Sequence, residues 1–111
     1  MDKRTFKQII YHTIRQYLIA LRDHNIQCQN VYLYGSYARG NFTKDSDIDL
    51  AIVSSDLSGD RIDDQVLLMN LRNNIDVRIE PYPFLPEEFT TDNPFVKTIL
   101  KTGEDLSFLL N

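Results

Sequence analysis

The spacing of apolar residues along the chain predicts three helices. Apolar side chains that recur at steps of three and four residues lie on one face of a helix. The first segment with this spacing contains Phe6, Ile9, Ile10, Ile14, Tyr17, Leu18 and Leu21. The second contains Ile62, Val66, Leu67, Met69 and Leu71. The third contains Phe95, Val96, Ile99 and Leu100.

Short polar signals indicate where two of these helices begin or end. Thr5 and Gln8 have the spacing of a capping box, which predicts the start of the first helix. Asn93 followed by Pro94 is a cap with proline at the first helical position, and Gly103 suits the residue after a helix end.

Three further segments predict β-strands. Residues 31–34 and 47–53 are short apolar runs, and the second of them is rich in branched side chains. Residues 75–80 alternate strictly between apolar and polar side chains, as in a strand with one buried face. The prolines that follow are expected to interrupt the chain, namely Pro81, Pro83 and Pro86. The apolar residues 106–110 are expected to pack back on the domain.

The order of these elements predicts the fold class. Helix, strand, strand, helix, strand, helix is the order of an α/β domain, here one domain over residues 1–111. The second and third strands are joined through a helix, which favours a parallel pair. If the end of the first strand and the start of the second serve one site, those two strands run antiparallel. We therefore expect a mixed sheet flanked by helices.

Composition narrows the class of protein. Of 111 residues, 42% are hydrophobic and 25% are charged, as in an ordinary soluble domain. The net charge of −4 argues against a broad basic surface for nucleic acid, so no direct nucleic-acid binding is expected. Cys28 is the only cysteine, which excludes an internal disulfide. Without a signal-peptide pattern or an apolar run of about 20 residues, the expected location is the cytoplasm, away from membranes.

Two aspartates carry the clearest chemical signal. Asp47 and Asp49 are two positions apart at the start of a predicted strand, so both carboxylates project from one face. Like charges this close repel each other unless a cation lies between them, and Mg²⁺ or Mn²⁺ prefers such oxygen ligands. Taken alone, an Asp-x-Asp pair is more often a solvated strand start. Asp76, on the polar face of the next strand, is expected to join them in a two-metal site. Glu80 shares that face and is the alternative.

The turn before the aspartates has the composition of a phosphate-binding turn. Gly35 and Ser36 follow the first predicted strand, where glycine lets a phosphate approach the backbone and the serine hydroxyl can donate to it. Arg39 can reach the same phosphates, and Gly40 allows the chain to leave the turn. Arg78 either neutralises a phosphate or pairs with a neighbouring carboxylate, and the sequence does not separate the two.

The combination of these motifs resembles a known family. Residues 35–40, Gly-Ser-Tyr-Ala-Arg-Gly, followed by residues 46–50, Ser-Asp-Ile-Asp-Leu, closely resemble the signature of the minimal nucleotidyltransferases in the DNA polymerase beta-type superfamily. The resemblance implies that Gly35 and Ser36 contact nucleotide phosphates and that Asp47 and Asp49 bind two Mg²⁺ ions. A third carboxylate is expected on a later strand, where Asp76 fits.

The family also implies a partner. Small stand-alone members are typically paired with a helical HEPN-type protein, often a toxic RNase. The resemblance therefore implies an antitoxin that transfers AMP from ATP to a tyrosine of that toxin, in a hetero-oligomer. One alternative is a binding module that neutralises its partner by contact alone. Another, an enzyme acting on nucleic-acid ends, is weakened by the acidic net charge.

Overall fold

The computed structural model describes residues 2–110, so the first and last residues of the expected domain lie outside the described range. Its helices are α1 (Lys3–Asp23), α2 (Ser36–Arg39), α3 (Arg61–Leu71) and α4 (Pro94–Thr102). Its strands are β1 (Asn30–Tyr34), β2 (Ile48–Val53), β3 (Ile79–Phe84) and the short β4 (Glu104–Asp105). Two 3₁₀ turns cover Pro86–Glu88 and Ser107–Leu110.

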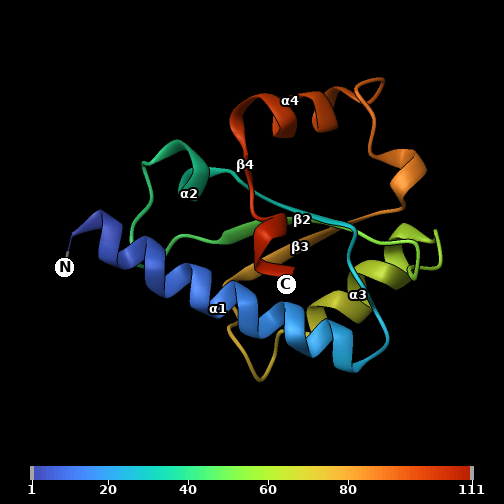
Figure 1. Cartoon of the computed structure of the whole chain (residues 1–111), viewed down its shortest axis with the longest axis horizontal. Helices are drawn as coiled ribbons and strands as arrows, with labels where there is room; N and C mark the ends of the chain where they lie inside the picture. The colour runs from blue at the N-terminus through green and yellow to red at the C-terminus, as the bar shows by residue number, and fades with distance from the viewer. Residues whose placement is uncertain (1, 111) are drawn as a thin grey trace.

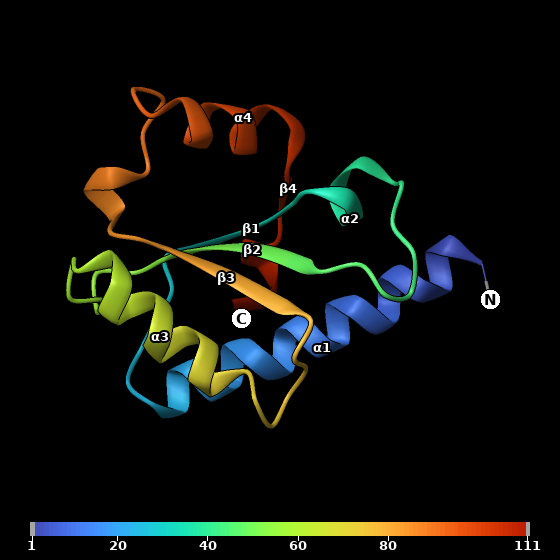
Figure 2. The ribbon, with the colours of Figure 1, turned by 180° about the vertical axis from the view of Figure 1, so that it is seen from behind.

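The expected mixed sheet is confirmed. The strand order is β3-β2-β1-β4, with β1 antiparallel to β2 and to β4, and β2 parallel to β3. Helices α1 and α3 cover one face of the sheet, and α4 lies on the opposite side (Figures 1 and 2). The short α2 follows the end of β1. No helix within residues 2–110 is long and apolar enough to cross a membrane.

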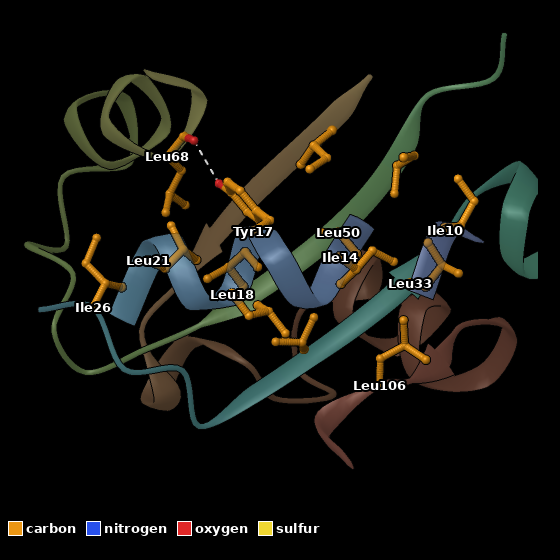
Figure 3. Packing of buried hydrophobic residues seen from close by; sticks show 14 of the residues in the cluster. Ile10, Ile14, Tyr17, Leu18, Leu21, Ile26, Leu33, Leu50, Leu68 and Leu106 are labelled. Atoms are coloured by element: carbon orange, nitrogen blue, oxygen red, sulfur yellow. Dashed lines mark hydrogen bonds between the residues drawn. The ribbon is translucent and has the colours of Figure 1, made fainter. Parts of the chain in front are cut away.

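The face under α1 and α3 holds the larger hydrophobic core. Figure 3 shows side chains of α1 packed against β1, β2 and α3. The most buried members include Ile10, Ile14, Tyr17, Leu21, Leu33, Leu50 and Leu68. The Tyr17 hydroxyl donates to the Leu68 carbonyl at 2.7 Å, which satisfies a polar group inside this core. Leu106, Leu109 and Leu110 pack against the same cluster, as expected for the apolar tail.

The opposite face of the sheet carries both a small aromatic core and the candidate chemistry. Side chains of a strand alternate between faces. The α4 side of the sheet therefore receives Ala51, Val53 and Phe84, which pack with Val96 and Ile99 and with several aromatic rings. The same alternation directs Asp49 and Glu80 to this face, beyond the edge of the aromatic core.

The third strand differs from its prediction. The sequence pattern placed it at residues 75–80 and ended it at Pro81, whereas the strand is Ile79–Phe84 and contains Pro81 and Pro83. Because β3 lies at an edge of the sheet, only alternate residues bond to β2. Backbone bonds from Ile48 to Arg78 and from Ser54 to Phe84 show that even-numbered residues face β2. The two prolines face outward, where an amide hydrogen is not needed.

Side chains of α3 cover this outward edge. The Arg72 guanidinium donates to the Ile79 carbonyl at 2.6 Å, and the Gln65 amide donates to the Pro81 carbonyl. An exposed strand edge can pair with another chain, so this cover protects it. The physical reason for the wrong strand prediction is therefore the position of β3 in the sheet, which the local alternation of residues 75–80 does not reveal.

Two details of the helices also differ. The predicted capping box at Thr5 and Gln8 is wrong, since α1 starts at Lys3 and the Asp2 carboxylate caps it by accepting from the Thr5 amide at 2.9 Å. Helix α3 is confirmed, but three of its apolar residues face outward, because the helix buries Leu68 and Asp64 instead. These exposed residues are Ile62, Val66 and Leu67. The predicted signals at Asn93, Pro94 and Gly103 delimit α4 as expected.

Candidate active site

Gly35 links the end of β1 to the turn of α2. It has φ +73°, a conformation that residues with a side chain rarely adopt. A Cβ at this position would overlap the Asp49 carboxylate oxygen Oδ2. Glycine is therefore needed twice, for the turn and for the close approach of Asp49. Gly40 ends α2 in a left-handed conformation, donating its amide to the Ser36 carbonyl at 3.0 Å.

Strand β2 brings the two predicted aspartates to the same side of the sheet. Asp47 lies just before the strand and is exposed, and Asp49 is its second residue and is partly buried. In the strand register, Asp49 is flanked by Tyr34 of β1 and by Glu80 of β3. The row Tyr34–Asp49–Glu80 therefore crosses three neighbouring strands on the face that α4 covers.

An open cleft of about 620 Å³ joins the turn, the aspartates and α4. Its lining consists of Tyr34, Gly35, Ser36, Arg39, Asp45, Ser46, Asp47, Asp49, Phe95 and Thr98. Five of the six predicted site residues are in this set. The predicted phosphate-binding residues thus lie around the same space as the two predicted metal ligands.

The charge distribution around Asp49 is unfavourable without a cation. Burial, together with the nearby negative charges of Asp47 and Glu80, raises the pKa of Asp49 to about 6, against a smaller opposing effect from Arg39. A carboxylate that resists ionisation among other carboxylates is typical of a site that receives a positive ion.

Asp76 does not join this cleft. It precedes β3, in the turn that follows α3, and its carboxylate pairs with Arg78 at 2.7 Å. The Arg78 side chain and backbone amide hydrogen-bond to this carboxylate and hold its pKa below the usual range of an aspartate. Arg78 also donates to the Lys44 carbonyl at 2.8 Å. The expectation that Asp76 opens a strand beside Asp49 is therefore wrong, and the pair instead ties the turn before β3 to the loop before β2.

Glu80, and not Asp76, lies beside Asp49 on the neighbouring strand, although it is not among the residues that line the cleft. It is the register partner of Asp49, and in a parallel pair such partners project from the same face. The Glu80 carboxylate accepts a hydrogen bond from the Arg72 guanidinium at 3.2 Å, and this contact orients the carboxylate. Because β3 begins at Ile79 and not at residue 75 as expected, Glu80 lies next to Asp49 where Asp76 was expected.

The residues present fit a divalent ion that is shared with phosphates. Within residues 2–110, no three histidine, cysteine or acidic side chains form a ready-made metal cluster. The pair Asp47 and Asp49 nevertheless supplies the hard oxygen ligands that Mg²⁺ prefers, and this ion usually completes its shell with water and substrate phosphates. A bound cation would offset both the burial of Asp49 and its repulsion by Asp47 and Glu80, which together raise its pKa.

Comparison with known proteins agrees with this arrangement. The sequence matches the family model described as polymerase beta, nucleotidyltransferase, over residues 16–107. The chain belongs to the polymerase beta nucleotidyltransferase family. The matched range includes the turn at Gly35, both strands that carry Asp49 and Glu80, and helix α4. A search of curated proteins found no significant match.

Several solved structures share the fold. A candidate nucleotidyltransferase from Sulfolobus solfataricus superposes with a TM-score of 0.64 at 18% identity, covering 95% of this chain and 86% of that one. A toxin–antitoxin structure with AMP-PNP gives 0.57 at 23% identity, covering 83% and 71%. A mutant of the toxin–antitoxin pair MntA-HpeT gives 0.53 at 18% identity, covering 96% and 73%. At these identities the likeness concerns the fold.

Several residues of the cleft were not predicted as site residues. Ser46 belongs to the signature but was given no role, and Asp45 has no clear signal. Both lie in a loop held by hydrogen bonds, one of them from the Thr43 amide to the Ser46 hydroxyl at 2.8 Å. Phe95 and Thr98 come from α4, about 50 residues after the aspartates, and only the fold brings them to the cleft. Tyr37, in the turn between Ser36 and Arg39, is fully buried and stacks on Phe42, so it does not line the cleft.

Proposed function

We propose that this protein is a metal-dependent nucleotidyltransferase that acts as an antitoxin. It transfers AMP from ATP to a tyrosine hydroxyl of a helical HEPN-type RNase toxin, with which it forms a hetero-oligomer. The observation that supports this proposal most strongly is the convergence of Asp47 and Asp49 with the Gly35–Ser36 turn in one cleft. The toxin–antitoxin structures that share the fold support the choice of partner.

The residues of the cleft, and Glu80 beside Asp49, have different roles in the proposed reaction. Ser36 and Arg39 hold the β- and γ-phosphates of ATP by hydrogen bonds and charge. Asp47 and Asp49 would hold two Mg²⁺ ions, which supply charge neutralisation at the phosphates when bound. Glu80, oriented by Arg72, accepts the proton of the acceptor hydroxyl.

The transfer itself is a substitution at the α-phosphorus. The tyrosine oxygen forms a bond to this phosphorus, and the bond to the oxygen that bridges to the β-phosphate breaks. The bridging oxygen leaves with its electron pair as part of pyrophosphate, and the tyrosine proton passes to Glu80. The main contribution of the protein is to position the reactants.

The product explains how the toxin is silenced. An AMP group adds a phosphate charge and a bulky nucleoside to the tyrosine. Next to an RNase site, this negative charge repels the RNA backbone and the nucleoside blocks access. The acidic net charge of −4 also suits association with a basic RNA-cleaving protein.

Co-expression with the toxin tests the proposal. The gene product encoded beside this protein is produced with the parent chain or with the Asp47→Ala/Asp49→Ala double variant. We expect growth and a mass increase of one AMP on the toxin with the parent, and neither with the double variant. A matched control, Asp105→Ala, changes an acidic residue outside the cleft and should behave as the parent.

The alternative of neutralisation by contact gives the opposite result. Growth rescued equally by the parent and the double variant, with no added mass on the toxin, would refute the enzymatic proposal. Native mass spectrometry of the co-expressed proteins would show whether a stable complex forms in each case.

A further inference from the structure

Helix α4 supplies an aromatic wall to the cleft. Phe95 and Thr98 are three residues apart on α4 and both line the cleft, beside Tyr34. The helix start fixes this placement, because the Asn93 side chain accepts from the Phe95 amide at 2.9 Å. Figures 1 and 2 show α4 above the sheet on the side away from α1. The proposed roles of the phosphate-binding turn and the carboxylates do not use this wall.

The ring of Phe95 is held firmly while remaining partly exposed. Its centroid lies 5.4 Å from that of Tyr34 and 5.0 Å from that of Tyr82, both in edge-to-face geometry. These two tyrosines belong to β1 and β3, so Phe95 lies over β2 between them. It packs in the cluster that contains Ala51 of that strand. A preorganised ring of this kind can stack a flat ligand at little entropic cost.

The row Tyr34–Asp49–Glu80 runs from β1 to β3, and its two ends suit the leaving group and the acceptor of the proposed reaction. In phosphoryl transfer the attacking and leaving oxygens lie roughly in line. The leaving pyrophosphate belongs to the β1 side, where Ser36 and Arg39 lie. The acceptor hydroxyl therefore approaches from the β3 side, past Glu80, the register partner of Asp49. The ribose and base attached to the α-phosphate must then extend to one side of the line between the acceptor oxygen and the leaving oxygen.

Two walls remain for the nucleoside. One is the loop rim at Asp45, Ser46 and Asp47, which is mostly acidic and exposed. The other is the wall of Phe95 and Thr98, which offers an aromatic ring next to a small polar side chain. A nucleobase gains more from an aromatic surface than from carboxylates, because stacking removes the contacting faces of the base and the ring from water.

On the basis of the proposed function, we propose that Phe95, with Thr98 beside it, forms the nucleoside-binding wall of the cleft and stacks on the base of the nucleotide substrate. Ser36 and Arg39 bind the triphosphate independently of the base. The wall thus determines nucleoside affinity, and the turn determines phosphate affinity.

Calorimetric titration of two ligands tests this division. ATP with Mg²⁺ carries base and triphosphate, whereas tripolyphosphate with Mg²⁺ carries the phosphates alone. We expect Phe95→Leu to weaken ATP binding about tenfold, in line with the loss of one stacked base, and to change tripolyphosphate binding less than twofold. Phe95→Tyr keeps the ring and should keep ATP affinity close to that of the parent.

A control and a second variant separate binding from folding. Leu100→Ala changes an exposed apolar residue of the same helix outside the cleft and should leave both affinities unchanged. Thermal melting of each variant reports folding, and Phe95→Met serves in place of Phe95→Leu if that variant melts below the titration temperature. The Met variant should show the same selective loss.

Three results would overturn the inference. Equal weakening of both ligands would assign Phe95 to packing, and unchanged ATP affinity with reduced transfer would assign it to the acceptor. Failure of the parent to bind ATP would refute the inference together with the proposed function. If the parent binds ATP but transfers no AMP, and Phe95→Leu selectively loses ATP affinity, the nucleoside-binding role of Phe95 is supported and only the proposed transfer is refuted.

Discussion

Asp49 is the residue around which the site is assembled. Its neighbours in the sheet are Tyr34 and Glu80, and its carboxylate fills the space that the missing side chain of Gly35 leaves. Burial and two nearby acidic residues make its ionised form costly in the free protein. The folded chain therefore loses stability to hold a charge arrangement that only a bound cation relieves.

This cost makes a prediction for stability as a function of pH. The pKa of Asp49 is about 6 in the folded protein, above that of an unfolded aspartate near 4. Below pH 4 the carboxyl is protonated in both states and costs nothing. Between pH 4 and pH 6 the unfolded chain ionises this carboxyl more readily than the folded chain does, so the protein loses stability as pH rises. Above pH 6 the loss is complete, because the carboxyl is then ionised in both states. In metal-free buffer, Asp49→Asn should therefore stabilise the protein at pH 7.5 by about 1 kcal/mol, allowing for partial solvent exposure.

Urea unfolding at pH 7.5 and pH 4 measures this difference. The gain should be clear at pH 7.5 and should nearly vanish at pH 4. Saturating Mg²⁺ with ATP should reverse the order at pH 7.5, because the ligand then stabilises the parent more than the variant. An equal gain at both pH values would contradict the electrostatic explanation.

The exchange of Asp76 for Glu80 can be tested residue by residue. Glu80→Gln removes the proposed proton acceptor and should lower AMP transfer by about 100-fold while ATP still binds. Asp76→Asn should lower transfer less than fivefold, since Asp76 contacts Arg78 outside the cleft. Intact-mass measurement of the toxin over time gives both rates. The reverse order of the two variants would return the role of third carboxylate to Asp76.

At the scale of elements, helix α3 holds the edge strand β3 in position. Helix α3 begins after Asp60, whose carboxylate accepts from the amides of Ile62 and Asp63 at 3.0 Å. Farther along the helix, Gln65 and Arg72 bind the outward edge of β3. A well-formed α3 thus determines where β3 lies and which of its residues faces Asp49.

The helix cap carries a stability prediction. Asp60→Ala removes both cap hydrogen bonds and should destabilise the protein by about 1 kcal/mol, which lowers the melting temperature by about 4–8 °C for a domain near this size. Asp63→Ala is the matched control, because the side chain of Asp63 is not part of the cap, and it should cost a few tenths of a kcal/mol. Similar losses in the two variants would show that the cap contributes little.

At the scale of the whole molecule, the two faces of the sheet have separate tasks. The α1 and α3 face buries the larger core, including Tyr17 and Leu68 (Figure 3). The α4 face holds a smaller aromatic core at one end and the cleft at the other. Because the stabilising core lies on the opposite face, the cleft can keep charged groups in positions that favour a ligand over stability.

The sequence by itself determined the helices, the first two strands and the local chemistry of the signature. The helical spacing, the strand at 47–53 and the signature around Gly35, Ser36, Asp47 and Asp49 all depend on neighbouring residues in the chain, whose periodicity and turn geometry act locally. The mixed sheet followed from the element order together with the assumption that the end of the first strand and the start of the second serve one site. The resemblance carried by these short motifs is confirmed by the family match over residues 16–107.

Only the tertiary structure decided which distant residues meet. Pro81 and Pro83 are tolerated because β3 is an edge strand, and the register that results places Glu80, and not Asp76, beside Asp49. Phe95 reaches the cleft because α4 packs across β1 and β3. Register and packing depend on contacts between segments far apart in the chain, and alternation along one segment cannot specify them.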